Sequence, residues 1–189
     1  MKTIYDYFRC ALLASVAVLA VGMCTVFTSC GGGDDDDVPG AGSAQVGVHR
    51  VDLHFENALP NWQHFVFVHG MKPDGSFAKL YENGKELPLD EIGGQGIGYS
   101  SEVIRDYSIS TEKNCGVLAA AITAVPEDFK PSSRDVTITA VGYIDGKRIY
   151  TKVVTIPAGT SAFCFAFSTD EGGGSELAID GKIVERDHD

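Results

Sequence analysis

The sequence predicts an all-β protein whose main domain is an antiparallel β-sandwich, immunoglobulin-like or transthyretin-like, of about eight or nine strands. Three observations lead to this fold class. Short apolar stretches alternate with turn residues, and Asn-Gly or Asp-Gly stands between two such stretches at three places. The chain also lacks a long amphipathic helical pattern and the strand–helix–strand alternation that is typical of parallel sheets.

The three dipeptides are Asn83-Gly84, Asp145-Gly146 and Asp180-Gly181. The two-residue turns that fit the twist of a hairpin need positive φ at both central residues, and Asn, Asp and Gly tolerate it best. The flanking pairs FAKLY and KELPL, TITAVGYI and KRIYTKVVTI, and ELAI and KIVE therefore read as three hairpins.

The remaining strands follow from their composition. Residues 51–55 alternate apolar and polar side chains, residues 64–68 are continuously apolar, and residues 161–167 carry regularly spaced aromatic rings. Residues 98–110 read as one further strand-like stretch. Residues 116–125 are rich in alanine, which favours helix, but their length and neighbours favour a buried strand. Residues 126–129 are compatible with one helical turn that begins at proline.

The N-terminus has the plan of a bacterial secretory signal. Lys2 and Arg9 precede an uncharged apolar run at residues 10–27. This run is close to the length that spans a bilayer, so a retained signal anchor is the alternative. The sequence Phe27-Thr28-Ser29-Cys30 resembles the lipobox of bacterial lipoproteins, although leucine is usual at the position of Phe27. The resemblance implies that residues 1–29 are a signal peptide and that Cys30 is lipidated.

Residues 30–43 form the second segment, a flexible acidic tether. The aspartates at 34–37 repel one another and bury nothing, and glycines flank them. A calcium loop spaces its carboxylates around a turn, so four consecutive aspartates make a poor cage. An acidic run just behind a lipidated cysteine resembles the export signal of Bacteroidetes surface lipoproteins. This resemblance implies an outer-membrane protein that faces the cell surface, with a periplasm-facing orientation as the alternative.

Residues 44–189 make one domain, and its charge limits the partners. The chain carries a net charge of −11, whereas nucleic-acid binding needs a basic surface and adsorption to anionic lipid needs basic clusters. We therefore expect no nucleic acid and no membrane contact apart from the lipid anchor. The expected ligand is a glycan or a protein, neutral or basic, whose identity the sequence does not give.

Two cysteines remain in the domain, Cys115 and Cys164. Outside the cytoplasm they can form a disulfide, but both lie in apolar stretches where buried thiols are common. Neither has a basic residue close in sequence, so a catalytic thiol is not expected.

His54 and His64 flank the turn at residues 57–61. A hairpin centred on Leu59 would place the two imidazoles opposite each other, with Glu56 beside them, in reach of a zinc or copper ion. The alternative is two exposed histidines on a strand, because a slip of one residue destroys the arrangement. We predict no cofactor and keep His54, His64 and Glu56 as the metal candidates.

Three weaker candidates complete the survey. The glycine-rich residues 93–98 lack the lysine and the following helix of a phosphate loop. Asp170, Glu171 and Glu176 surround three glycines where a weak calcium ion could bind. A row of strand tyrosines could stack on sugars, and its candidate members are Tyr81, Tyr99, Tyr107, Tyr143 and Tyr150.

The catalytic motifs GxSxG, HExxH, CxxC and the Walker loop are all absent from the sequence. We therefore predict no enzyme, but a non-catalytic binding or accessory module. The first alternative is a structural subunit of a fimbria-like or other cell-surface assembly. The second is a hydrolase whose carboxylates come together only in the fold.

Overall fold

The computed structural model describes residues 45–57, 62–88, 97–101, 106–126, 131–170 and 173–187. All of them belong to one compact unit, Ala44–Asp189. The predicted signal peptide, Cys30 and the tether lie outside the described residues. In the part of the chain that the structure describes, no helix is long and apolar enough to cross a membrane.

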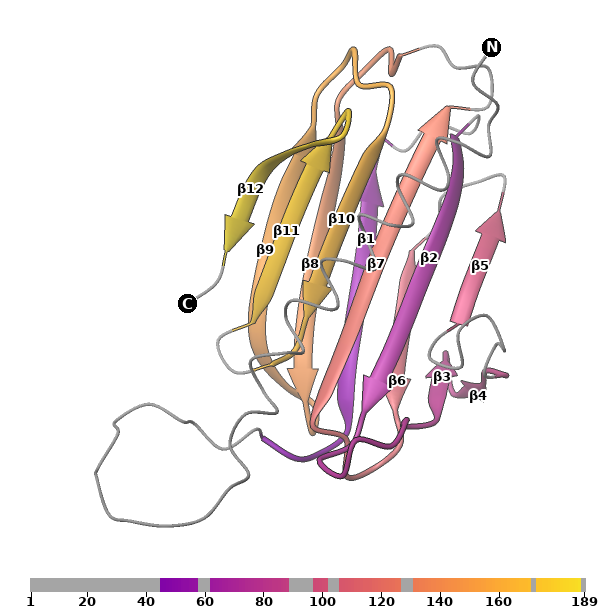
Figure 1. Ribbon diagram of the computed structural model, residues 1–189, viewed down its shortest axis with the longest axis vertical. Helices are drawn as coiled ribbons and strands as arrows, with labels where there is room; N and C mark the ends of the chain where they lie inside the picture. The colour runs from indigo at the N-terminus through magenta and orange to yellow at the C-terminus, as the bar shows by residue number, and fades with distance from the viewer. Residues whose placement is uncertain are drawn as a thin grey trace, which may run out of the picture. The chain divides into compact units, whose positions relative to one another are not determined.

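Within these described residues, twelve strands form two six-stranded antiparallel sheets (Figure 1). The first sheet has the order β4-β3-β6-β1-β8-β9, and the second has the order β12-β11-β10-β7-β2-β5. The strands of the first sheet are β1 (His49–Glu56), β3 (Leu80–Glu82), β4 (Lys85–Glu86), β6 (Tyr107–Thr111), β8 (Val136–Ile144) and β9 (Lys147–Ile156). Those of the second are β2 (Trp62–Met71), β5 (Ile97–Ser101), β7 (Val117–Pro126), β10 (Phe163–Ser168), β11 (Gly174–Ile179) and β12 (Lys182–Asp187).

The predicted antiparallel sandwich is therefore confirmed, with more strands than expected. One reason is that residues 98–110 are not a single stretch. β5 pairs with β2 in the second sheet, whereas β6 pairs with β1 in the first. The alanine-rich stretch forms strand β7, Val117–Pro126, as its length and neighbours favoured. The helical turn expected at residues 126–129 does not begin at Pro126, which ends this strand, and residues 127–129 lie outside the described residues.

All three predicted hairpins are present, with the turn geometry that their residues favour. The φ angles are 50° and 80° at Asn83 and Gly84. They are 49° and 78° at Asp145-Gly146, and the same at Asp180-Gly181. These turns join β3 to β4, β8 to β9 and β11 to β12.

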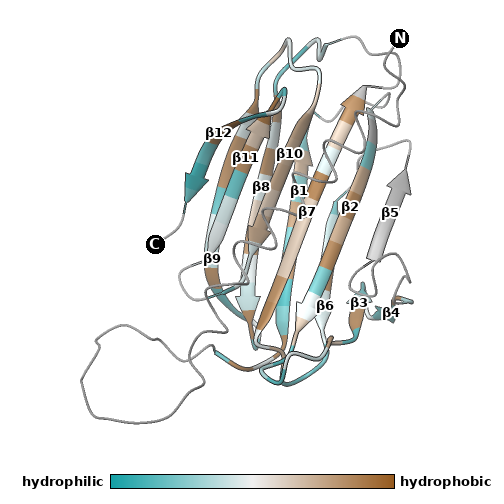
Figure 2. Ribbon diagram, viewed as in Figure 1, coloured by the Kyte–Doolittle hydropathy of each residue, from teal (hydrophilic) through white to brown (hydrophobic). Residues whose placement is uncertain are grey.

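The core lies between the two sheets because alternate residues of each strand point inward. β8 alternates buried and half-buried positions over its whole length, and hydrophobic residues occur on the strands of both sheets (Figure 2). Trp62 of β2 packs on Phe163 of β10 with ring centroids 5.2 Å apart. Val51 and Leu53 of β1 belong to the same hydrophobic cluster.

The domain has two ends, and the chain enters it at one of them. Gly47 exchanges two backbone hydrogen bonds with Cys115, and the Val48 N–H donates to Asp145 Oδ1 at 2.8 Å. We call this the tether end. β1 runs from here towards the opposite end, the far end, where Glu56 pairs with Thr137 at the start of β8.

Candidate functional site

The outer face of the first sheet carries a cleft of about 260 Å³. It lies where β1 and β6 run side by side, and the turn between β3 and β4 forms its border. A hydrogen bond from Asn83 N–H to Ser108 C=O, at 3.3 Å, holds this turn against β6. The cleft is lined by Asp52, Leu53, His54, Asn83, Asp106, Tyr107 and Ser108.

The alternation of β1 sets the chemistry of this cleft. Val51, Leu53 and Phe55 point into the core, so Asp52 and His54 face outward. Asp52 lies opposite Ser108 of β6 in the strand register. Its Oδ1 accepts a hydrogen bond from Ser108 Oγ at 2.7 Å.

His54 is held by Asp106, the residue just before β6. The distance from His54 Nδ1 to Asp106 Oδ2 is 2.6 Å, and Asp106 Oδ1 accepts the Phe55 N–H at 3.0 Å. The hydrogen bond and the charge of Asp106 raise the pKa of His54, and Glu56, with its Oε1 3.9 Å from His54 Nε2, adds to this. The imidazole thus has a fixed orientation although its side chain is 54% exposed.

The arrangement is suited to binding a polar ligand. Carboxylates, a hydroxyl group, an amide and an imidazole line one small cleft, and all of them form hydrogen bonds readily. Nucleophilic catalysis by serine needs the hydroxyl group to contact the imidazole base. Here Ser108 donates to Asp52, and no hydrogen bond joins Ser108 to His54 within the described residues.

The candidate metal arrangement of His54, His64 and Glu56 is not formed. β1 and β2 lie in different sheets, so they do not form the hairpin that would place the two histidines opposite each other. His64 is buried in the core, where its Nε2 contacts the Tyr107 hydroxyl group. Among the described residues, no group of three His, Cys, Asp or Glu side chains could hold a metal ion.

The possible disulfide between Cys115 and Cys164 is not formed. In the register of β10 and β7, Cys164 lies opposite Thr123. Thr123 follows Cys115 by eight residues in the chain, so the two cysteines are about 25 Å apart along the direction of β7. A disulfide needs Cα atoms within about 7 Å.

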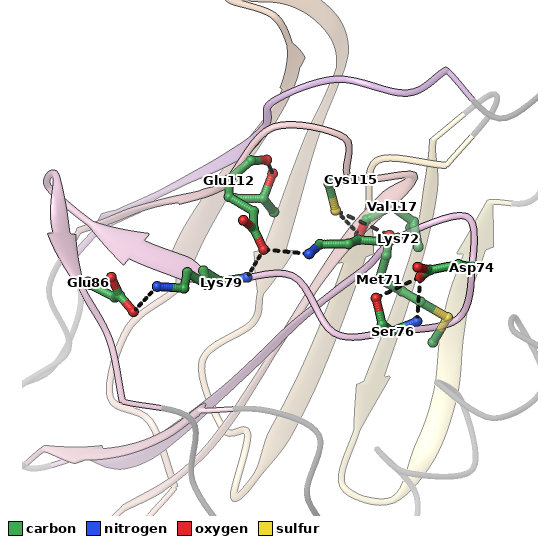
Figure 3. Close-up of polar contacts among 10 residues, drawn as sticks. Met71, Lys72, Asp74, Ser76, Lys79, Glu86, Glu112, Cys115 and Val117 are labelled. Atoms are coloured by element: carbon green, nitrogen blue, oxygen red, sulfur yellow. Dashed lines mark hydrogen bonds and ion pairs between the residues drawn. The ribbon is translucent and has the colours of Figure 1, made fainter.

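Cys115 lies at the tether end, where its thiol contacts backbone carbonyl groups (Figure 3). Its Sγ lies 3.3 Å from Met71 O and 3.0 Å from Val117 O, and burial raises the pKa of the thiol. Beside it, Lys72 Nζ contacts a Glu112 carboxylate oxygen at 2.9 Å, and this oxygen also accepts the Lys79 N–H at 3.0 Å. A raised pKa opposes the thiolate that catalysis would need.

The weaker candidates do not form sites in the described residues. Residues 93–96 and Glu171 lie outside them. Glu176 is buried and pairs with Arg186, while Asp170 accepts a hydrogen bond from Ser168 Oγ at 2.7 Å.

The tyrosines do not form one row. Tyr107 is buried, and Tyr150 stacks on Phe167 with ring centroids 5.4 Å apart. Tyr143 has the Arg50 guanidinium over its ring at 3.9 Å. Tyr81 lies in β3, and the side chain of Tyr99 lies outside the described residues.

Comparison with known proteins identifies the fold. No family model matches the chain, and no curated protein does. Two solved structures share the sandwich. One is a DUF4425 family protein from Bacteroides ovatus, with a TM-score of 0.51 and 19% identity over 67% of this chain and 96% of that chain.

The other solved structure is a domain of unknown function, DUF4425, from Bacteroides vulgatus. It has a TM-score of 0.51 and 22% identity over 67% of this chain and 95% of that chain. At this identity the likeness shows the fold alone. The chemistry of the cleft therefore has to be argued from the residues of this chain.

Asp106, Asn83 and Ser108 were not predicted as site residues. Asn83 had a signal, but it was the signal of a turn. Asp106 and Ser108 lie more than fifty residues along the chain from the β1 side chains with which they form hydrogen bonds. A local sequence pattern does not predict pairs that are so far apart in the sequence.

Proposed function

We propose that this chain is a lipoprotein anchored in the outer membrane through Cys30, facing the cell surface, and that it acts as a non-catalytic binding module. The observation that carries the binding proposal is the cleft on the outer face of the first sheet, which polar side chains line. Asp106 precedes β6, and Asp52 and His54 lie in the middle of β1.

The ligand that we propose is polar and either neutral or basic, such as a glycan or a basic protein segment. The carboxylates of Asp52 and Asp106 accept hydrogen bonds from hydroxyl or ammonium groups. The net charge of −11 repels acidic partners.

Binding arrays test the cleft. Glycans and host proteins are screened with the wild-type chain, and each hit is titrated against Asp106→Asn and Asp52→Asn. Both changes remove a lining carboxylate, so we expect at least tenfold weaker binding, about 1.4 kcal/mol. Glu86→Gln removes an exposed carboxylate of β4 that does not line the cleft and should bind as the wild type does. Equal affinity of all four proteins would refute the cleft as the site.

Protease shaving tests the location. Intact cells are treated with a protease that does not cross the outer membrane, and the domain is detected by blotting. Loss of the domain supports surface exposure, and survival until the cells are broken contradicts it. Cys30→Ala should abolish lipid labelling and release the protein from the membrane.

The proposal of a lipid anchor is based on the lipobox at residues 27–30 and the acidic run at residues 34–37. Bacteroides is the source of both similar structures, and the acidic run resembles the export signal of the same bacterial group. The main alternative is a structural subunit of a surface assembly. One specific feature favours it, the exposed edge strand β12.

A further inference from the structure

Arg50 lies beside the cleft, on the same outward face of β1 as Asp52. Its neighbour Val51 is buried in the core, so the alternation of β1 turns the Arg50 side chain outward. In the strand register Arg50 lies between Ser110 of β6 and Tyr143 of β8. The polar surface of the cleft therefore continues by two residues along β1, which is about 7 Å.

Two contacts hold the guanidinium group of Arg50 in place. Its Nε lies 3.3 Å from Asp52 Oδ1, and its Cζ lies 3.9 Å from the centre of the Tyr143 ring. The side chain is 40% exposed, and among the described residues its terminal Nη atoms form no hydrogen bond. A guanidinium group held in this way offers its outer N–H donors in a fixed position, so little side-chain entropy is lost when a ligand binds.

Each carboxylate that lines the cleft has a cationic partner. Asp52 is paired with Arg50, and Asp106 is paired with His54 at 2.6 Å. The hydrogen bond from Asp106 raises the pKa of His54 above its ordinary value of 6.5, so this imidazole is mostly protonated at about pH 6. The charges of the two pairs cancel, and the further carboxylate of Glu56 does not line the cleft. The acidity of the whole chain therefore does not extend into the cleft.

This balance of charges favours a neutral ligand that is rich in hydroxyl groups over a basic protein segment. An ammonium group in the cleft would meet the positive charges of Arg50 and His54, which offset the attraction of the two carboxylates. A hydroxyl group can donate a hydrogen bond to a carboxylate and accept one from a guanidinium group. The planar fork of Arg50 can also donate to two neighbouring oxygen atoms at once.

We propose that the ligand of the cleft is a neutral oligosaccharide and that Arg50 determines this specificity, by donating hydrogen bonds to two adjacent hydroxyl groups of a sugar unit next to the one in the cleft. The inference rests on the proposed binding function and narrows its ligand to one class. Asp52 joins the two sugar positions, because it accepts the hydrogen bond from Ser108 and also contacts Arg50.

Calorimetric titration of the full chain, purified in detergent, tests the proposal. A panel of neutral hexose oligosaccharides and the basic peptide tetralysine are the probes, at about pH 6, where His54 is charged. At least one oligosaccharide should bind. Arg50→Met removes the charge and the fork, so we expect at least tenfold weaker binding of this oligosaccharide. Arg50→Lys keeps the charge without the fork and should lose nearly as much.

Arg134→Met is the matched control, because Arg134 is exposed and does not line the cleft. It should bind the oligosaccharide as the wild type does. Salt gives a second measurement, made on the unmodified protein. Raising the NaCl concentration from about 50 to about 500 mM should change the affinity for the neutral oligosaccharide by less than about twofold, whereas it would weaken a charged ligand strongly.

Three results would each overturn the proposal: no neutral oligosaccharide binds, Arg50→Met binds as the wild type does, or Arg134→Met weakens binding as much as Arg50→Met. Tetralysine binding that Arg50→Met strengthens and Asp106→Asn weakens would show that the cleft is the site but that its ligand is basic. An oligosaccharide that binds with equal affinity to the wild type, Asp52→Asn and Asp106→Asn would instead refute the cleft itself, so the two proposals fail separately.

Discussion

His49 links the point of chain entry to both sheets. This side chain is buried, its Nδ1 lies 2.6 Å from Thr169 Oγ1, and its Nε2 lies 2.9 Å from the Gln45 carbonyl oxygen. Burial lowers the pKa of His49, and this effect outweighs the hydrogen bonds to Gln45 and Cys115, which raise it. The folded protein therefore prefers the neutral imidazole.

This preference makes stability depend on pH. In the unfolded chain His49 takes up a proton near its ordinary pKa of 6.5, whereas the folded protein resists protonation to lower pH. The contribution of His49 to stability is thus complete above pH 6.5 and is lost as the pH falls from there towards the folded pKa. Urea unfolding at several pH values should show a shallower decline for His49→Gln than for the wild type. Parallel curves would contradict this account.

Gly146 and Gly173 show two different reasons why a position requires glycine: a positive φ angle, and a lack of space for a Cβ atom. Both have positive φ, 68° and 78°. A Cβ at Gly173 would lie 2.5 Å from the Tyr150 ring, whereas a Cβ at Gly146 meets nothing within 4 Å. Gly146→Ala should cost about 1–2 kcal/mol for its left-handed backbone alone. Gly173→Ala should cost about 1–3 kcal/mol more, because the ring must move. Equal free energies of unfolding for the two variants would show that the Tyr150 ring moves aside without measurable cost.

At the residue scale, sequence reasoning found outward positions but not their partners. The alternation of β1 correctly separated Val51 and Leu53 from Asp52 and His54. Pairing His54 with His64 failed because it assumed that consecutive strands are neighbours. The true partner, Asp106, comes from β6 and lies 52 residues away.

At the element scale, Lys152 joins the edges of the two sheets. Its Nζ contacts Glu185 and Asp187, and these two carboxylates raise the pKa of Lys152. Lys152→Met keeps the largely buried stem but removes the contacts. We expect a loss of about 1 kcal/mol, since both carboxylates are nearly half exposed, and faster hydrogen exchange in β12.

The matched control for Lys152 is Lys79→Met. Lys79 pairs with Glu86 on the surface at 3.0 Å, and both side chains are more than half exposed. This change should alter neither stability nor the exchange of β12. If Lys152→Met also leaves the hydrogen exchange of β12 unchanged, then the pairing with β11 is sufficient to hold β12 in place.

The elements that the sequence predicted well are those with local causes. Asn83-Gly84 and its two counterparts dictate hairpins through the φ angles of two adjacent residues. The sequence predicts one stretch at residues 98–110, because the change of sheet between β5 and β6 depends on distant partners and has no local signal. The short strands β3 and β4 follow from their turn, but the place of β3 beside β6 does not.

On the scale of the whole molecule, the chain passes repeatedly between the sheets. β1 belongs to the first sheet, β2 to the second, β3 and β4 to the first, β5 to the second and β6 to the first. Neither sheet is a continuous piece of sequence, so neither can form its core alone.

We therefore expect one cooperative unfolding transition for the domain. Far-UV and near-UV circular dichroism should give the same denaturation midpoint. Refolding should be slow for a domain of this size, since most strand pairs join distant segments. Two separate midpoints would contradict the interdependence of the sheets.

The position of β1 has a mechanical consequence. β1 receives the chain at the tether end and carries Asp52 and His54 of the cleft, and it lies between β6 and β8. With the proposed anchor on the N-terminal segment and a ligand in the cleft, tension would enter the domain at the start of β1 and pass along this strand. The hydrogen bonds on both sides would then be loaded together in shear instead of being unzipped one at a time. A protein that holds its ligand in flowing fluid would benefit from this direction of pull.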